Sequence, residues 1–77
     1  KTKDWRVKLF AERHLTKRQT EVSEFLFSGL VAKEIADRMG ISLKTVKFHL
    51  TGVYKKLQVK NKSEFLHLCY NSMREQQ

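Results

Sequence analysis

The sequence has 77 residues, of which 40% are apolar, and this suffices for one small folded domain with a modest core rather than a disordered tail. Its 16 Lys and Arg outnumber its 8 Asp and Glu, and the net charge of +8 favours a polyanionic partner. The lack of proline favours an all-α fold, and a single cysteine, Cys69, excludes an internal disulfide and fits a reducing cytoplasm.

Residues 1–14 carry Trp5, Val7, Leu9 and Phe10 among charged residues, without a clean helical period. We interpret residues 1–14 as a linker that is partly helical, ahead of a domain at residues 15–75. No apolar run approaches the roughly 20 residues that span a bilayer, and no signal peptide is visible. Because the chain begins with Lys rather than Met, we expect it to be part of a longer protein.

The first helix of the domain is predicted from Lys17 to Phe27 or Ser28. Thr16 and Gln19 have the spacing of a capping box, and an apolar stripe follows at helical spacing. Gly29 is a suitable residue to end this helix, because glycine adopts the left-handed conformation without strain.

A second, shorter helix is predicted over residues 32–39. Ile35, Ala36 and Met39 supply its inward face, and Gly40 closes it. Val31, which precedes it, offers no side-chain cap.

The third helix is predicted over residues 43–57, with Ser42 as its N-cap. At about 100° per residue, one narrow stripe faces a core, and it consists of Val46, Leu50, Val53 and Leu57. The opposite side gathers Lys44, Phe48, Thr51 and Lys55, with Lys47 at its border.

That opposite side is suited to nucleic acid. Residues 38–63 contain seven basic residues and no acidic one, which concentrates positive potential on one element. The alternative is a solvated lysine face with one exposed phenyl ring, since a single exposed apolar residue is common.

A fourth helix is predicted from about Lys62, where Asn61 and Glu64 again have capping-box spacing. Its apolar residues cover more than one face, so it is either a self-association surface or a well-covered core helix. The residues of this predicted dimerisation surface are Phe65, Leu66, Cys69 and Met73.

The second and third predicted helices, joined by a short turn with glycine, have the order of a helix-turn-helix. In that arrangement the second helix enters the major groove of DNA and places its early residues on base edges.

The sequence resembles the LuxR/FixJ/GerE-type helix-turn-helix domain over roughly residues 15–70. The residues that carry the resemblance are Leu15, Thr16, Arg18, Glu21, Val22, Gly29, Lys33 to Ala36, Gly40 to Ser42, Thr45 to Lys47, His49, Lys56, Leu57, Val59 and Asn61. The resemblance implies a four-helix bundle in a bacterial transcription regulator. It implies a dimer, joined through the fourth helix, on two-fold symmetric sites. It also implies an output domain that follows a receiver domain or a small-molecule sensor domain, as in response regulators and quorum-sensing regulators.

Six positions depart from the family pattern. Gln19 stands where Glu is usual, and Gly52 stands where Asn is usual, at a cost of about 1 kcal/mol of helix stability relative to Ala. Ser23 and Phe27 replace a larger and a smaller residue, which we interpret as a compensated change of size. Val31 and Ala32 replace Ser and Asn and remove a cap.

The DNA contacts are assigned from helix position and from the resemblance. Base contacts are predicted for Lys47, Phe48, Thr51 and Lys44, because lysine donates to guanine and a phenyl ring packs on a thymine methyl. Lys44 is also a candidate for a phosphate. Contacts to the DNA backbone are predicted for Lys33, Ser42, Thr45, Lys55 and Arg18. Arg18 has the alternative of an ion pair with Glu21 or Glu34.

The expected partners are double-stranded DNA, a second copy of the chain on that DNA, and RNA polymerase. We expect no cofactor, metal, membrane or small-molecule ligand in this stretch, and no enzymatic activity. Three alternatives stay open: a helical protein-interaction module that docks through the fourth helix, a promoter-reading module of a sigma factor, and a basic amphipathic helix on an anionic membrane.

Overall fold

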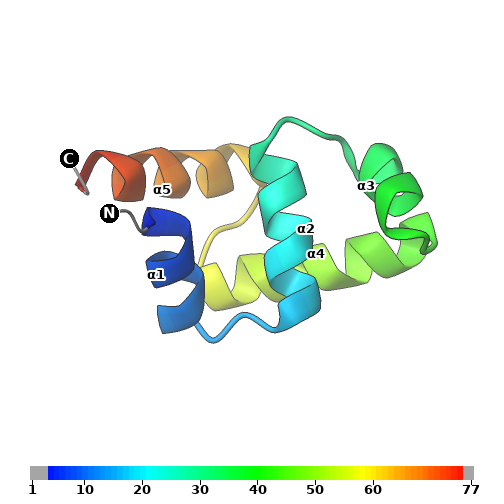
Figure 1. Cartoon of the computed structure of the whole chain (residues 1–77), viewed down its shortest axis with the longest axis horizontal. Coiled ribbons are helices and arrows are strands. Elements are labelled where there is room, and N and C mark those ends of the chain that lie inside the picture. Colours follow the sequence, from blue (N-terminus) through cyan, green and yellow to red (C-terminus); the bar gives the residue numbers. More distant parts are fainter. Residues whose placement is uncertain (1–3, 76–77) are drawn as a thin grey trace.

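The computed structural model describes residues 4–75, and within that range it contains five helices and no strand (Figure 1). The helices are α1 (Trp5–Glu12), α2 (Lys17–Phe27), α3 (Ala32–Met39), α4 (Leu43–Leu57) and α5 (Lys62–Glu75). The predicted all-α class is confirmed. The four helices expected between residues 17 and 75 are α2 to α5, and α1 precedes them.

α1 is a two-turn helix that packs on the rest of the chain. Asp4 caps it by accepting from Arg6 N at 3.1 Å. Leu9 and Phe10 are buried, whereas Val7 is 61% exposed. The two inward residues are adjacent in sequence and Val7 points outward, so no clean period was visible.

Side-chain caps begin most of the helices. Thr16 and Gln19 form the expected capping box, with bonds of 3.1 and 2.9 Å. Asn61 Oδ1 accepts from Glu64 N at 2.9 Å, but the Glu64 carboxylate accepts from Lys60 N rather than from Asn61 N. Val31 has no side-chain cap, and the Glu34 carboxylate instead accepts from Val31 N at 2.9 Å.

The first four helices end in the same way. Each is followed by a residue in the left-handed region, and these residues are His14, Gly29, Gly40 and Gln58. In each case the next amide donates back to a carbonyl five residues earlier, as Ile41 N does to Ala36 O at 3.1 Å. The expected helix ends at Gly29 and Gly40 are therefore confirmed.

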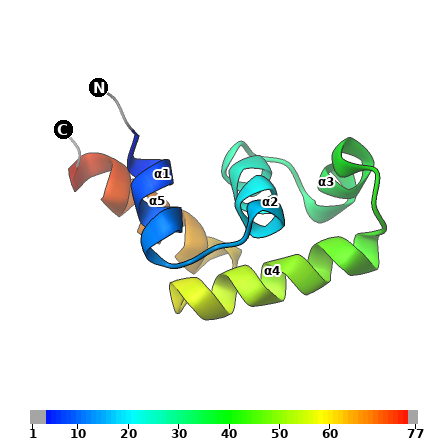
Figure 2. The same ribbon diagram turned by 60° about the horizontal axis from the view of Figure 1, so that its bottom comes forward.

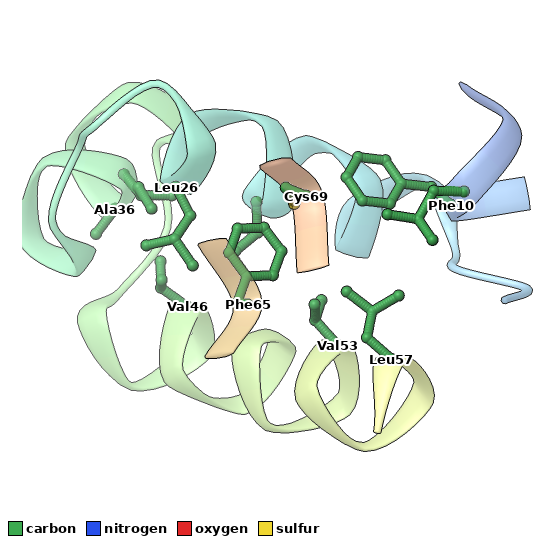
Figure 3. Packing of buried hydrophobic residues seen from close by; sticks show 11 residues of the cluster. Phe10, Leu26, Ala36, Val46, Val53, Leu57, Phe65 and Cys69 are labelled. Atoms are coloured by element: carbon green, nitrogen blue, oxygen red, sulfur yellow. The ribbon is translucent and has the colours of Figure 1, made fainter. Parts of the chain in front are cut away.

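α4 forms the base on which the other helices pack. α2 crosses above its middle, α3 lies near its start, and α1 and α5 lie near its end (Figure 2). Val46, Val53 and Leu57 face inward from α4 and are buried, and Leu50 is half-buried. Figure 3 shows Val46, Val53 and Leu57 meeting side chains from each of the other helices, among them Phe10, Leu26, Ala36, Phe65 and Cys69.

The Ser23 and Phe27 positions serve different neighbours. Ser23 is fully buried, and its hydroxyl has no hydrogen-bond partner within the described residues. The Phe27 ring lies 5.0 Å from the Trp5 ring and 5.4 Å from the Tyr70 ring, measured between centroids. Phe27 thus joins α1 and α5 to the end of α2.

Candidate nucleic-acid interface

The outer face of α4 is exposed along its whole length. Lys44, Lys47, Phe48, Thr51 and Lys55 all lie in exposed positions, on the side away from the buried stripe. We call these five residues the α4 outer face. It carries three lysines and no acidic side chain.

Phe48 is the most exposed large apolar side chain of the described chain, at 74%. Its only ring neighbour there is His49, whose centroid lies 5.7 Å away in an edge arrangement. Phe48 therefore adds nothing to the core, and its position between lysines leaves its apolar surface free for a ligand.

The start of α4 is fixed by two hydroxyls. Ser42 Oγ accepts from Thr45 N at 3.0 Å, and Ser42 Oγ and Thr45 Oγ1 lie 2.8 Å apart. The Ser42 cap predicted from sequence is therefore confirmed. The two hydroxyls are bonded to each other and to the first turn of α4, and their role as phosphate contacts stays a prediction.

Thr51 also has an internal partner, because its hydroxyl donates to Lys47 O at 3.0 Å. In this rotamer the hydroxyl hydrogen of Thr51 is already donated to Lys47 O, so the hydroxyl oxygen can act toward a ligand only as an acceptor. It can accept from a cytosine or adenine amino group, but it cannot donate to a phosphate. This geometry suits a base contact better than a backbone contact.

The basic residues outside α4 have mixed positions. Lys33 is exposed in the first turn of α3. Arg18 lies 3.5 Å from Glu21 in an ion pair whose members are both substantially exposed, and so the Glu21 alternative is the one the structure holds. Exposed pairs contribute little to stability, so this one is easily exchanged for a phosphate.

Lys56 follows Lys55 in the sequence, but its side chain turns inward. Its Nζ donates to His14 O at 2.8 Å and to Gln19 Oε1 at 2.9 Å. It is half-buried and does not belong to the α4 outer face. Lys56 lies one residue after Lys55 and therefore about 100° around the helix, so the helical period already indicated that the two side chains point in different directions.

The predicted dimerisation surface needs a correction. Phe65 and Cys69 are both fully buried within this chain, because their spacing of four residues puts both on the core side of α5. Burial also raises the pKa of the Cys69 thiol to about 12, so it stays protonated at neutral pH. Leu66 and Met73 are half-buried at the edge of this core side.

The exposed stripe of α5 was missed by the sequence reasoning. Its residues are Ser63, His67, Tyr70 and Arg74, all exposed and spaced three or four apart. The predicted surface was placed on the apolar residues of this helix, although the polar residues also recur at helical spacing.

Residues 4–75 hold no group of three or more His, Cys, Asp and Glu side chains that could bind a metal ion. No helix within that range is long and apolar enough to cross a membrane.

The chain is similar in sequence to known bacterial regulatory proteins. The sequence profile of the bacterial regulatory proteins of the luxR family, named GerE, matches residues 13–69. The transcriptional regulatory protein UhpA of Salmonella typhimurium is 43% identical over 72 residues, which cover 91% of this chain and 37% of UhpA.

Two further relatives show how widely the similarity extends. The spore germination protein GerE of Bacillus subtilis is 46% identical over 50 residues, covering 65% of this chain and 68% of GerE. The oxygen regulatory protein NreC of Staphylococcus carnosus is 39% identical over 54 residues, covering 70% of this chain and 25% of NreC. The chain thus spans about a third or less of the length of UhpA and NreC. No solved structure gives a significant match.

Proposed function

The chain belongs to the luxR family of bacterial regulatory proteins, and from this premise we propose that it is the sequence-specific DNA-binding output domain of a transcription regulator. The observation that carries the proposal is the α4 outer face, where three lysines surround an uncovered phenyl ring and no acid is present. A face that only contacts water gains nothing from a phenyl ring at its centre, and Phe48 is 74% exposed.

In the proposed complex α4 is the recognition helix. It has 15 residues and is therefore about 22 Å long, and the major groove of B-DNA, about 12 Å wide, admits one such helix. Lys47 donates to guanine O6 and N7, and Phe48 packs on a thymine methyl. Thr51 accepts from a base amino group, and Lys44 reaches a base edge or the adjacent phosphate.

The remaining contacts hold α4 in register on the duplex. Lys55 near the end of α4 and Lys33 at the start of α3 neutralise phosphates, and the N-terminal amides of α4 add donors beside Ser42 and Thr45. Arg18 leaves its ion pair with Glu21 and binds a phosphate instead. Such contacts supply affinity without reading sequence.

The proposal includes a homodimer on two-fold symmetric DNA. Two copies meet through α5, with the half-buried Leu66 and Met73 beside the exposed stripe of α5. RNA polymerase is the further partner, and the site of action is the bacterial cytoplasm. The family resemblance supports these points, and the naming of a relative as a transcriptional regulatory protein supports a role in transcription.

A protein-interaction module that docks through α5 without binding DNA is the alternative. The exposed stripe of α5 suits such a module, but that function leaves the α4 outer face unexplained. The two proposals differ in their response to salt.

The experiment measures the affinity of the chain for duplexes selected from a random pool, at two salt concentrations. We expect selection of one sequence class and a steep loss of affinity as salt rises, with a slope in log–log form of about −0.9 per neutralised phosphate. Absence of binding in dilute salt, with self-association intact, would favour the alternative.

A further inference from the structure

Lys56 ties the last turn of α4 to the connection between α1 and α2, which is far away in the sequence. Its Nζ bonds His14 O and Gln19 Oε1, which lie 42 and 37 residues away, and its own carbonyl accepts from Arg13 Nη1 at 3.5 Å. His14 is the left-handed residue that ends α1, and Gln19 belongs to the capping box of α2. The last turn of α4 is therefore tied to the end of α1 and to the start of α2.

The bond from Arg13 also satisfies one of the carbonyls at the C-terminus of α4. The last carbonyls of a helix have no partner inside it. Here Tyr54 O accepts from Val59 N at 2.9 Å, and Lys55 O accepts from Gln58 N at 3.2 Å. Lys56 O accepts from Arg13 Nη1. A cation at this end is also favoured by the helix dipole.

α1 is held at its other end by aromatic packing. Trp5, the single tryptophan of the chain, lies against Phe27, and Phe10 is 2% exposed in the core. α1 lies outside residues 13–69, the stretch that matches the family profile. The contacts of Arg13 and His14 thus connect α1 directly to the proposed recognition helix.

We infer that Lys56 is a positioning residue for DNA recognition, not a phosphate contact, and that it couples the docking of α1 to the binding of DNA. This inference rests on the proposed function. Loss of the Lys56 bonds frees the last turn of α4, and with it the neighbouring Lys55, from the rest of the fold. Anything that pulls α1 from the bundle has the same effect, and by reciprocity bound DNA holds α1 in place.

The test compares Lys56→Met, which keeps the stem but removes the donors, with Lys56→Arg, which keeps donors and charge. Lys55→Met is the charge-matched control, because Lys55 is an exposed neighbour. For each protein, circular dichroism checks folding, and the dissociation constant for a selected duplex is measured across a salt series. Acrylamide quenching of Trp5 fluorescence is recorded with and without the duplex.

We expect Lys56→Met to weaken binding about fivefold or more with an unchanged salt slope, and Lys56→Arg to restore most of the affinity. Lys55→Met lowers the salt slope by about one phosphate. DNA reduces quenching of Trp5 in the wild type and in Lys56→Arg, but not in Lys56→Met.

The inference is overturned if Lys56→Met lowers the salt slope as Lys55→Met does, or if DNA leaves Trp5 quenching unchanged in the wild type. Arg13→Met, which removes only the part-buried bond to Lys56 O, serves as a second variant if Lys56→Met does not fold. It is expected to weaken binding with an unchanged slope, and unaltered binding would also count against the inference. A wild-type chain that binds no duplex defeats the proposed function itself, which is a separate result.

Discussion

The side-chain amide of Gln19 lies directly over the backbone of Gly52, so that a Cβ added at Gly52 would stand 2.5 Å from Gln19 Nε2. The same amide is held in place, because its Oε1 accepts from Thr16 N and from Lys56 Nζ, each at 2.9 Å. The two departures from the family pattern at positions 19 and 52 are therefore linked: the missing side chain makes room for the amide.

This link predicts a non-additive pair of substitutions. In the wild type Gly52→Ala is expected to give no gain or to lose up to about 1 kcal/mol, because the helix-propensity gain is offset by displaced hydrogen bonds. In a Gln19→Ala background the same change should stabilise by about 1 kcal/mol. Urea denaturation of the four proteins gives the coupling, and additivity within about 0.3 kcal/mol would contradict the link.

The left-handed residue after α4 predicts a stabilising substitution. Gln58 has φ 59° and ψ 42°, a conformation that strains any residue with a Cβ. Gln58→Gly should raise the free energy of unfolding by about 0.5–1 kcal/mol, net of the added freedom of the unfolded chain. Gln58→Ala is the control and should give no gain. Thermal denaturation compares the two, and equal melting temperatures would count against strain at this position.

The buried hydroxyl of Ser23 predicts a second gain. Its oxygen is fully buried and has no partner within the described residues, which carries a desolvation cost. Ser23→Ala should therefore stabilise by about 1 kcal/mol. Ser28→Ala is the matched control, because Ser28 is exposed and donates to Glu24 O. A loss of stability in Ser23→Ala would show that the hydroxyl has a partner.

Because its thiol is buried, Cys69 should lower the free energy of unfolding of the protein in alkali. Burial raises the pKa of its thiol from 9.0 to about 12. Between these values the unfolded chain has lost the proton and the folded chain has kept it, so stability falls as pH rises, by up to about 1.4 kcal/mol per pH unit. Burial also raises the pKa of Tyr54, which acts in the same direction above pH 10.

Cys69→Ala separates the two groups. This variant should be less stable at pH 8 because of the lost packing, but its stability should stay nearly flat up to pH 10. Urea denaturation at pH 8, 9 and 10 makes the comparison. Parallel pH profiles for the variant and the wild type would exclude the thiol as the cause.

Much of the fold was readable from local sequence. The bounds of α2, α3 and α4 followed from caps, glycine ends and apolar spacing, since each of these signals acts within a few residues. α1 was poorly defined because its core residues, Leu9 and Phe10, are adjacent and form no stripe. The left-handed ends at His14 and Gln58 carry no glycine, so composition gave no sign of them.

The candidate site was readable where it depends on one helix alone. The exposure of Lys44, Lys47, Phe48, Thr51 and Lys55 followed from the period of α4. The inward turn of Lys56 depends on His14 and Gln19, which are distant in sequence, and the burial of Phe65 and Cys69 depends on how α5 meets the other helices. Such facts come from tertiary packing, which periodicity does not report.

We propose that the α4 outer face reads base pairs. The most direct test measures the affinities of Lys47→Ala and Lys55→Ala for a selected duplex and for a random duplex at one salt concentration. We predict that Lys47→Ala loses about 1–3 kcal/mol on the selected duplex and much less on the random one, whereas Lys55→Ala weakens both equally. Equal losses on both duplexes for Lys47→Ala would contradict the claim.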